Sequence, residues 1–131
     1  EFDAALATRG RPYVLAHFGD HLPSFEGQWQ GVSMRPQPSR IDPHFVTYFN
    51  IQTGGGLPRA GYRLSTTYPV LDIALLGGLI LDVAGLPLDP YFAANARLRQ
   101  RCGGLFLECA DKDALAAYHQ YIYDELGAVA F

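Results

Sequence analysis

The sequence has few charges and no long apolar run, and each shortage excludes a class of protein. Charged residues make up 18% of the chain, and the formal net charge is −3 with a pI near 5.7. A general nucleic-acid binder would show a basic face, so we expect no nucleic-acid partner. The most apolar stretch, Pro69–Leu88, carries Asp72 and Asp82, whereas a membrane-spanning helix needs about 20 apolar residues in a row. We therefore expect no membrane partner.

Cysteine is scarce too, with Cys102 and Cys109 the two in the chain. We predict a strand over Gly103–Cys109, in which seven steps of about 3.3 Å hold the two Cα atoms roughly 23 Å apart. A disulfide needs Cα atoms within about 7 Å, so both thiols are expected to stay unpaired. Unpaired thiols fit a reducing compartment, and the sequence therefore predicts a cytoplasmic protein.

Apolar and aromatic residues are plentiful by contrast. Hydrophobic residues make up 49% and aromatic residues 13% of the 131 positions, which is enough for a stable core in a chain of this size. No internal repeat, linker or low-complexity run divides the sequence. We therefore predict a single domain over residues 1–131.

The first two thirds of the chain carry strand patterns. Tyr13–Phe18 is a short apolar run, and His44–Thr53 alternates between two faces with a period of two. Gly61–Tyr68 alternates again, so we expect it to form an antiparallel hairpin with His44–Thr53. Leu71–Val83 is nearly symmetric about Gly77-Gly78, and two adjacent glycines would cost a helix about 2 kcal/mol. We predict a second hairpin there, turning at the glycines.

The last third carries helix patterns. Pro90–Arg101 has the composition of a short helix, and its arginines are expected to form a solvated basic edge. Asp111 is a candidate cap for a second helix that ends before Gly127. Its apolar stripe has helical spacing and comprises Leu115, Tyr118, His119, Ile122 and Leu126. The fold class predicted is α+β: an antiparallel curved sheet, or a small β-barrel, with the C-terminal helix packed on it.

Three of the four histidines cluster in sequence with an aspartate, and this group is the candidate catalytic site. His17, Asp20, His21 and His44 lie in or beside predicted loops. Imidazoles and carboxylates can act as general acid and base, or bind a metal. The alternative is that these groups cap a loop and bond to backbone. If the site is catalytic, we expect these groups to act as general acid and base without a metal or redox cofactor.

The segment Phe25-Glu-Gly-Gln-Trp29 resembles the start of the lipocalin-like β-barrels, and the C-terminal helix is similar to the helix that those barrels pack outside. The resemblance implies a cavity for an apolar ligand, with Trp29 as a wall. The chain departs from that pattern because a strand precedes Trp29 and Pro90–Arg101 is helical in composition. The alternative is a Trp29 that fills the core.

Aromatic residues supply the predicted lining of a pocket. The leading functional prediction is a pocket that binds, and can transform, a small apolar or aromatic molecule. The candidate ligand-binding residues are Trp29, Phe45, Phe49, Tyr62 and Tyr118.

The rival prediction is a non-catalytic accessory subunit. It would self-associate through the apolar Leu71–Val83 hairpin and the tail Gly127–Phe131. A homo-oligomer is expected in either case.

Overall fold

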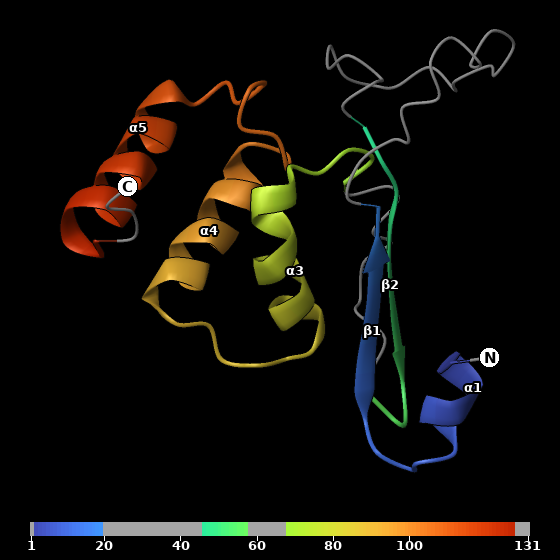
Figure 1. Cartoon of the computed structure of the whole chain (residues 1–131). Helices are drawn as coiled ribbons and strands as arrows, with labels where there is room; N and C mark the ends of the chain where they lie inside the picture. The colour runs from blue at the N-terminus through green and yellow to red at the C-terminus, as the bar shows by residue number, and fades with distance from the viewer. Residues whose placement is uncertain (1, 20–45, 58–67, 128–131) are drawn as a thin grey trace, which may run out of the picture.

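The computed structural model describes residues 2–19, 46–57 and 68–127 of the chain. Figure 1 shows a pair of strands beside a row of helices. In chain order the elements are α1 (Phe2–Ala7), β1 (Tyr13–Phe18), β2 (Phe49–Gly54), the 3-10 turn η2 (Ile73–Leu75), α3 (Leu76–Val83), α4 (Pro90–Arg101), α5 (Lys112–Gln120) and the π-helical turn η3 (Tyr121–Glu125). The α+β class and the C-terminal helix are as predicted.

The sheet is antiparallel and pairs β1 with β2, from Tyr13 opposite Gly54 to Phe18 opposite Phe49. Within the described ranges it has two strands and does not close into a barrel. The predicted strand Tyr13–Phe18 is confirmed with its bounds. The predicted partner of the second strand was Gly61–Tyr68, whereas β2 pairs with β1, and residues 61–67 lie outside the described ranges.

The predicted hairpin over Leu71–Val83 is wrong, because this segment is helical. Asp72 begins η2 by accepting a hydrogen bond from the Ala74 N–H at 3.1 Å, and α3 follows without a break. The buried side chains gather on one face of the helix; they are Leu75, Leu76, Leu79 and Val83. Burial of that face outweighs the helix-propensity cost of two glycines.

Each of the two later helices begins at an aspartate cap: Asp111 is the cap that the sequence predicts for α5, and the structure adds Asp89 for α4. Asp89 accepts from the Phe92 N–H at 2.8 Å, with Pro90 in the first helical turn. Asp111 accepts from the Ala114 N–H at 2.9 Å. Among the described residues no helix is long and apolar enough to cross a membrane.

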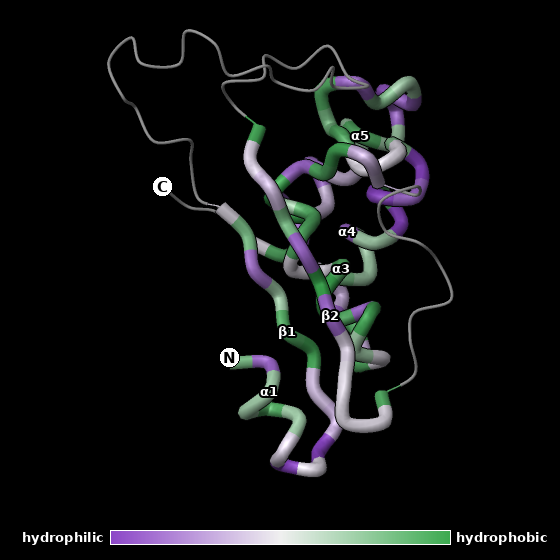
Figure 2. The backbone as a smooth tube through the Cα atoms, turned by 90° about the vertical axis from the view of Figure 1, so that its right-hand side faces the viewer, coloured by the Kyte–Doolittle hydropathy of each residue, from purple (hydrophilic) through white to green (hydrophobic). Residues whose placement is uncertain are grey.

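The helices stack side by side outward from the sheet, as Figures 1 and 2 show. α3 contacts β1, α4 packs against α3, and α5 packs against α4. The C-terminal helix thus packs against another helix, and α3 is the helix next to the sheet. One apolar cluster joins α3 to the sheet and contains Tyr68, Leu79, Val83, Val14, Phe49, Ile51 and Leu71. A second joins α4 to α5 and centres on Ala94, Leu98, Cys102, Cys109, Tyr118 and Ile122.

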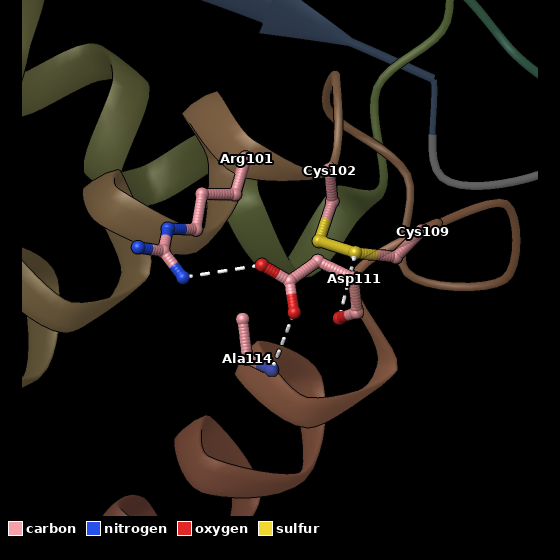
Figure 3. A network of polar contacts seen from close by, with 5 residues as sticks. All are labelled: Arg101, Cys102, Cys109, Asp111 and Ala114. Atoms are coloured by element: carbon pink, nitrogen blue, oxygen red, sulfur yellow. Dashed lines mark hydrogen bonds and ion pairs between the residues drawn. A yellow bond between two sulfur atoms is a disulfide. The ribbon is translucent and has the colours of Figure 1, made fainter.

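Cys102 and Cys109 form a disulfide, so the expectation of unpaired thiols is wrong. Their Cα atoms lie 4.4 Å apart, because the chain between them turns back instead of extending as a strand. Gly103 and Gly104 adopt positive φ angles of 60° and 91°, which glycine tolerates without strain. Figure 3 shows the disulfide between the end of α4 and the start of α5, where Asp111 also pairs with Arg101 at 3.1 Å.

Candidate functional site

The carboxyl end of β1 leads directly into the predicted acid–base residues. The ladder continues one step past the strand, since the Gly19 N–H donates to the Tyr48 carbonyl at 3.0 Å. Gly19 packs so closely on Thr47 that a Cβ at position 19 would overlap the threonine Oγ1. The backbone is therefore fixed immediately before Asp20, and position 19 has no room for a side chain.

Two aromatic rings are exposed at this end of the sheet. Phe18 is 49% exposed and Tyr48 is 64% exposed. Phe18 faces Phe49 across the ladder, while Tyr48 holds Gly19 through its carbonyl. Exposed aromatic surface therefore lies beside the point at which the chain continues into Asp20 and His21.

Of the four predicted acid–base residues, the structure places His17. It lies on β1 opposite Asn50, and both side chains are exposed. Because successive side chains of a strand alternate between faces, His17 lies on the face opposite that of Phe18 and Phe49. Asp20, His21 and His44 lie outside the described residues.

Of the five predicted ligand-binding residues, the structure places Phe49 and Tyr118, and it does not bring them together. Phe49 belongs to the cluster between the sheet and α3, whereas Tyr118 belongs to the cluster between α4 and α5. Trp29, Phe45 and Tyr62 lie outside the described residues.

Tyr118 serves a packing role in the described structure. Its ring is buried, and its hydroxyl accepts a hydrogen bond from the Asn95 Nδ2 at 3.3 Å. Burial raises the pKa of Tyr118 above its ordinary value of 10.0, and the hydrogen bond from Asn95 opposes part of that rise. The phenol therefore stays neutral at physiological pH.

Sequence reasoning missed a buried polar cluster on α4. Arg99 was expected on a solvated basic edge, yet it is 1% exposed and its Nη2 donates to the Asp82 Oδ2 at 2.6 Å. Its guanidinium also lies over the Tyr68 ring, 5.6 Å from the centroid. The spacing of Asn95 and Arg99 is the sequence signal that could have identified this cluster. The two residues are four apart, and each follows directly after a buried apolar residue of α4.

Metal-ligand geometry is not seen in the part of the chain that the structure describes. No group of three or more His, Cys, Asp or Glu side chains there could hold a metal ion. The two sulfurs are joined to each other.

Fold and site together define an α+β structure with a disulfide and a glycine-anchored strand end. No family model matches the chain, and no solved structure matches it. The chain is similar to a protein of Haemophilus influenzae (strain ATCC 51907 / DSM 11121 / KW20 / Rd) described as an uncharacterized protein, with 28% identity over 123 residues. That match covers 92% of this chain and 20% of the relative, so the chain spans about a fifth of the relative's length. These comparisons offer no link to lipocalin-like barrels, and that resemblance stays a prediction.

Proposed function

We propose that the chain binds a small apolar or aromatic molecule at the carboxyl end of β1 and acts on it by acid–base chemistry without a redox cofactor. The observation that carries this proposal is the pairing of exposed rings with the fixed strand end. Phe18 and Tyr48 present aromatic surface there, and the two residues that follow Gly19 in the sequence are Asp20 and His21. Pockets combine apolar lining with a few polar groups that orient the ligand.

The anchored glycine supports the same assignment. Catalytic groups need a rigid support, because small displacements from the productive geometry cost rate. Gly19 is held by its hydrogen bond to Tyr48 and by close contact with Thr47. The backbone is therefore held at Gly19, the residue that precedes Asp20 in the sequence. Because the relative is about five times as long, we propose that further parts of a longer protein contribute to the complete site.

The binding half of the proposal is tested with N-phenyl-1-naphthylamine, a neutral aromatic dye whose fluorescence rises in apolar surroundings. We expect saturable binding that Tyr48→Ser and Phe18→Ser each weaken by about five- to tenfold, the loss typical of one aromatic contact. The matched control is Phe2→Ser, because Phe2 is 67% exposed but lies on α1 at the other end of the chain's sheet. Equal weakening by all three variants would contradict a site at this end.

The catalytic half is tested separately with 4-nitrophenyl acetate, a small aromatic ester. Asp20→Asn and His21→Gln should leave dye binding within about twofold while lowering ester turnover by about 100-fold, as expected for loss of a general acid or base. His119→Gln is the control, because His119 lies on α5 among the rings of Phe106, Tyr118 and Tyr123. Ester turnover that is unchanged in both variants would contradict the catalytic half of the proposal and leave only ligand binding.

The accessory role is the second candidate, and one observation favours it. Leu107 is 80% exposed at the disulfide-closed loop, and a loop that is already rigid loses less conformational freedom when it binds a partner. The Leu71–Val83 segment is helical, and its side chains Leu75, Leu76, Leu79 and Val83 are buried inside the chain, whereas Ile73 is exposed. Residues 128–131 lie outside the described ranges. Sedimentation of Leu107→Ser beside the parent chain tests it: a homo-oligomer should dissociate in the variant.

The pairing of the two cysteines also supports a proposal about the compartment in which the chain folds. The prediction of a cytoplasmic protein depended on unpaired thiols, and Cys102 and Cys109 are paired. Stable disulfides form chiefly in oxidising compartments. We propose that the chain folds in such a compartment; alkylation of the protein taken directly from cells, followed by mass spectrometry, would find both cysteines unlabelled.

A further inference from the structure

The α3–α4 interface contains polar atoms that its protein contacts leave unsatisfied. Arg99 uses one nitrogen, Nη2, to bind Asp82. Within the described residues nothing accepts from its Nε or Nη1, and nothing donates to the Asn95 Oδ1. All three atoms are buried, and buried polar groups in proteins nearly always have a hydrogen-bond partner.

The orientation of the Asn95 amide is fixed by its surroundings. Its nitrogen faces the carbonyl of Ala74 at 3.1 Å, and a carbonyl can only accept. The oxygen must therefore point the other way, toward Gly78, where a Cβ would stand 2.6 Å from it. The acceptor atom of Asn95 thus lies in the α3–α4 interface.

Asn95 and Arg99 are neighbours along that interface. They are one helical turn apart on α4, and their contacts Gly78 and Asp82 are one turn apart on α3. Side chains four residues apart on a helix are neighbours on one face. A small molecule bound beside one of these two side chains therefore lies next to the other.

The charges of Arg99 and Asp82 limit the kind of molecule that can bind here. Asp82 already balances the guanidinium, so a bound anion would add a second negative charge beside it and would face the acceptor oxygen of Asn95. A cation would meet the charge of Arg99. The partner must accept from Arg99 and donate to Asn95, and it must be neutral and small.

We infer that a long-lived water molecule is bound between α3 and α4, accepting a hydrogen bond from Arg99 and donating one to Asn95. The face of the guanidinium is covered by the Tyr68 ring, so the water binds at the edge, in the plane of the N–H groups. Buried waters typically make about three hydrogen bonds to groups that lack other partners. This site is separate from the strand end proposed above for ligand binding.

The test is NMR of the full chain with 15N-labelled arginine and asparagine, in which contacts to water are measured at mildly acidic pH to suppress proton exchange. The Arg99 Nε–H should show a NOESY cross-peak to water with the sign of a bound molecule. Arg97 and Arg101 are exposed on the same helix and should show none. The Asn95 amide should share the water cross-peak and lose it in Arg99→Met.

Two results would overturn the inference. A hydrogen-bond scalar coupling from the Arg99 Nε to a protein carbonyl would show that another part of the chain supplies the acceptor. A saturable shift of the same nitrogen with chloride or inorganic phosphate would show an anion site instead. The parent chain alone gives both readings, so the outcome does not depend on the variant folding.

Discussion

The side-chain oxygen of Asn95 on α4 lies against Gly78 on α3, so close that a Cβ at position 78 would stand 2.6 Å from it. The amide nitrogen of the same residue donates to the carbonyl of Ala74 and to the hydroxyl of Tyr118. One buried side chain therefore ties α4 to η2 and to α5, and it does so because Gly78 leaves room for it. The approach of α3 and α4 depends on this glycine.

Gly78→Ala should destabilise the domain, and Gly77→Ala should not. Overpacking at position 78 costs about 1–3 kcal/mol, offset by a gain in helix propensity of about 1 kcal/mol. Gly77 is exposed, and a Cβ there meets only the Phe92 ring, at 3.3 Å. The unfolding free energies of the two variants, measured in urea, should differ by at least about 1 kcal/mol. Equal values would mean that the Asn95 side chain moves away from a Cβ at position 78 at little cost.

The disulfide should contribute to stability through the loop that it closes. A loop this short is expected to contribute about 2–3 kcal/mol by restricting the unfolded chain. We expect the double variant Cys102→Ala, Cys109→Ala to lose that amount of unfolding free energy, and reductant to cause a similar loss in the parent chain. Hydrogen exchange should rise most in α5, because Asp111 caps that helix two residues after Cys109. A variant as stable as the parent would contradict this.

Local signals predicted β1, the last two helices and the cap of α5, but not the central helix or the disulfide. The cap at Asp111 acts within one turn, so the sequence alone identified where α5 begins, and the composition of Pro90–Arg101 identified α4. Gly77-Gly78 is locally a turn signal, and its helical state depends on packing against α4. The cysteine prediction failed because the paired glycines after Cys102 reverse the chain.

The candidate site shows the same division. The position of β1, and hence of the strand end before Asp20, followed from a short apolar run bounded by Gly19. The burial of Arg99 could not follow from composition, because an arginine is normally solvated. It requires Asp82 and Tyr68, which come from segments 17 and 31 positions away in sequence and meet α4 only in the folded chain.

The Arg99–Asp82 pair should respond asymmetrically to substitution. Asp82→Ala leaves a guanidinium buried without its counter-charge, which we expect to cost about 2–4 kcal/mol after allowing for solvent around this carboxylate. Arg99→Met keeps a chain of similar length, and Asp82, at 41% exposed, stays hydrated, so the cost should be smaller. Thermal or urea unfolding gives the order. A larger loss in Arg99→Met would mean that the pair itself is strongly stabilising.

Tyr118 should make stability fall at alkaline pH. Burial raises its pKa in the folded chain above 10.0, so the unfolded chain loses the phenolic proton first. Its contribution is therefore complete below pH 10 and is lost as pH rises through the folded-state pKa. Urea midpoints measured from about pH 8 to pH 11 should decline less steeply in Tyr118→Phe than in the parent. Parallel declines would show that the buried phenol ionises equally in both states.

The close contact between Gly19 and Thr47 predicts a variant that a second substitution repairs. A Cβ at position 19 would overlap the Thr47 Oγ1 but would lie 3.2 Å from its Cβ, so removing the hydroxyl relieves most of the clash. Gly19→Ala should cost about 1–3 kcal/mol and weaken dye binding at the strand end, whereas Thr47→Ala alone should change stability by less than about 1 kcal/mol. The double variant should recover both stability and dye binding, because the strand end returns to its position. Urea unfolding and dye titration of the four proteins form a complete double-mutant cycle. If the double variant regains stability but not dye binding, the strand end is a structural anchor and the ligand site lies elsewhere.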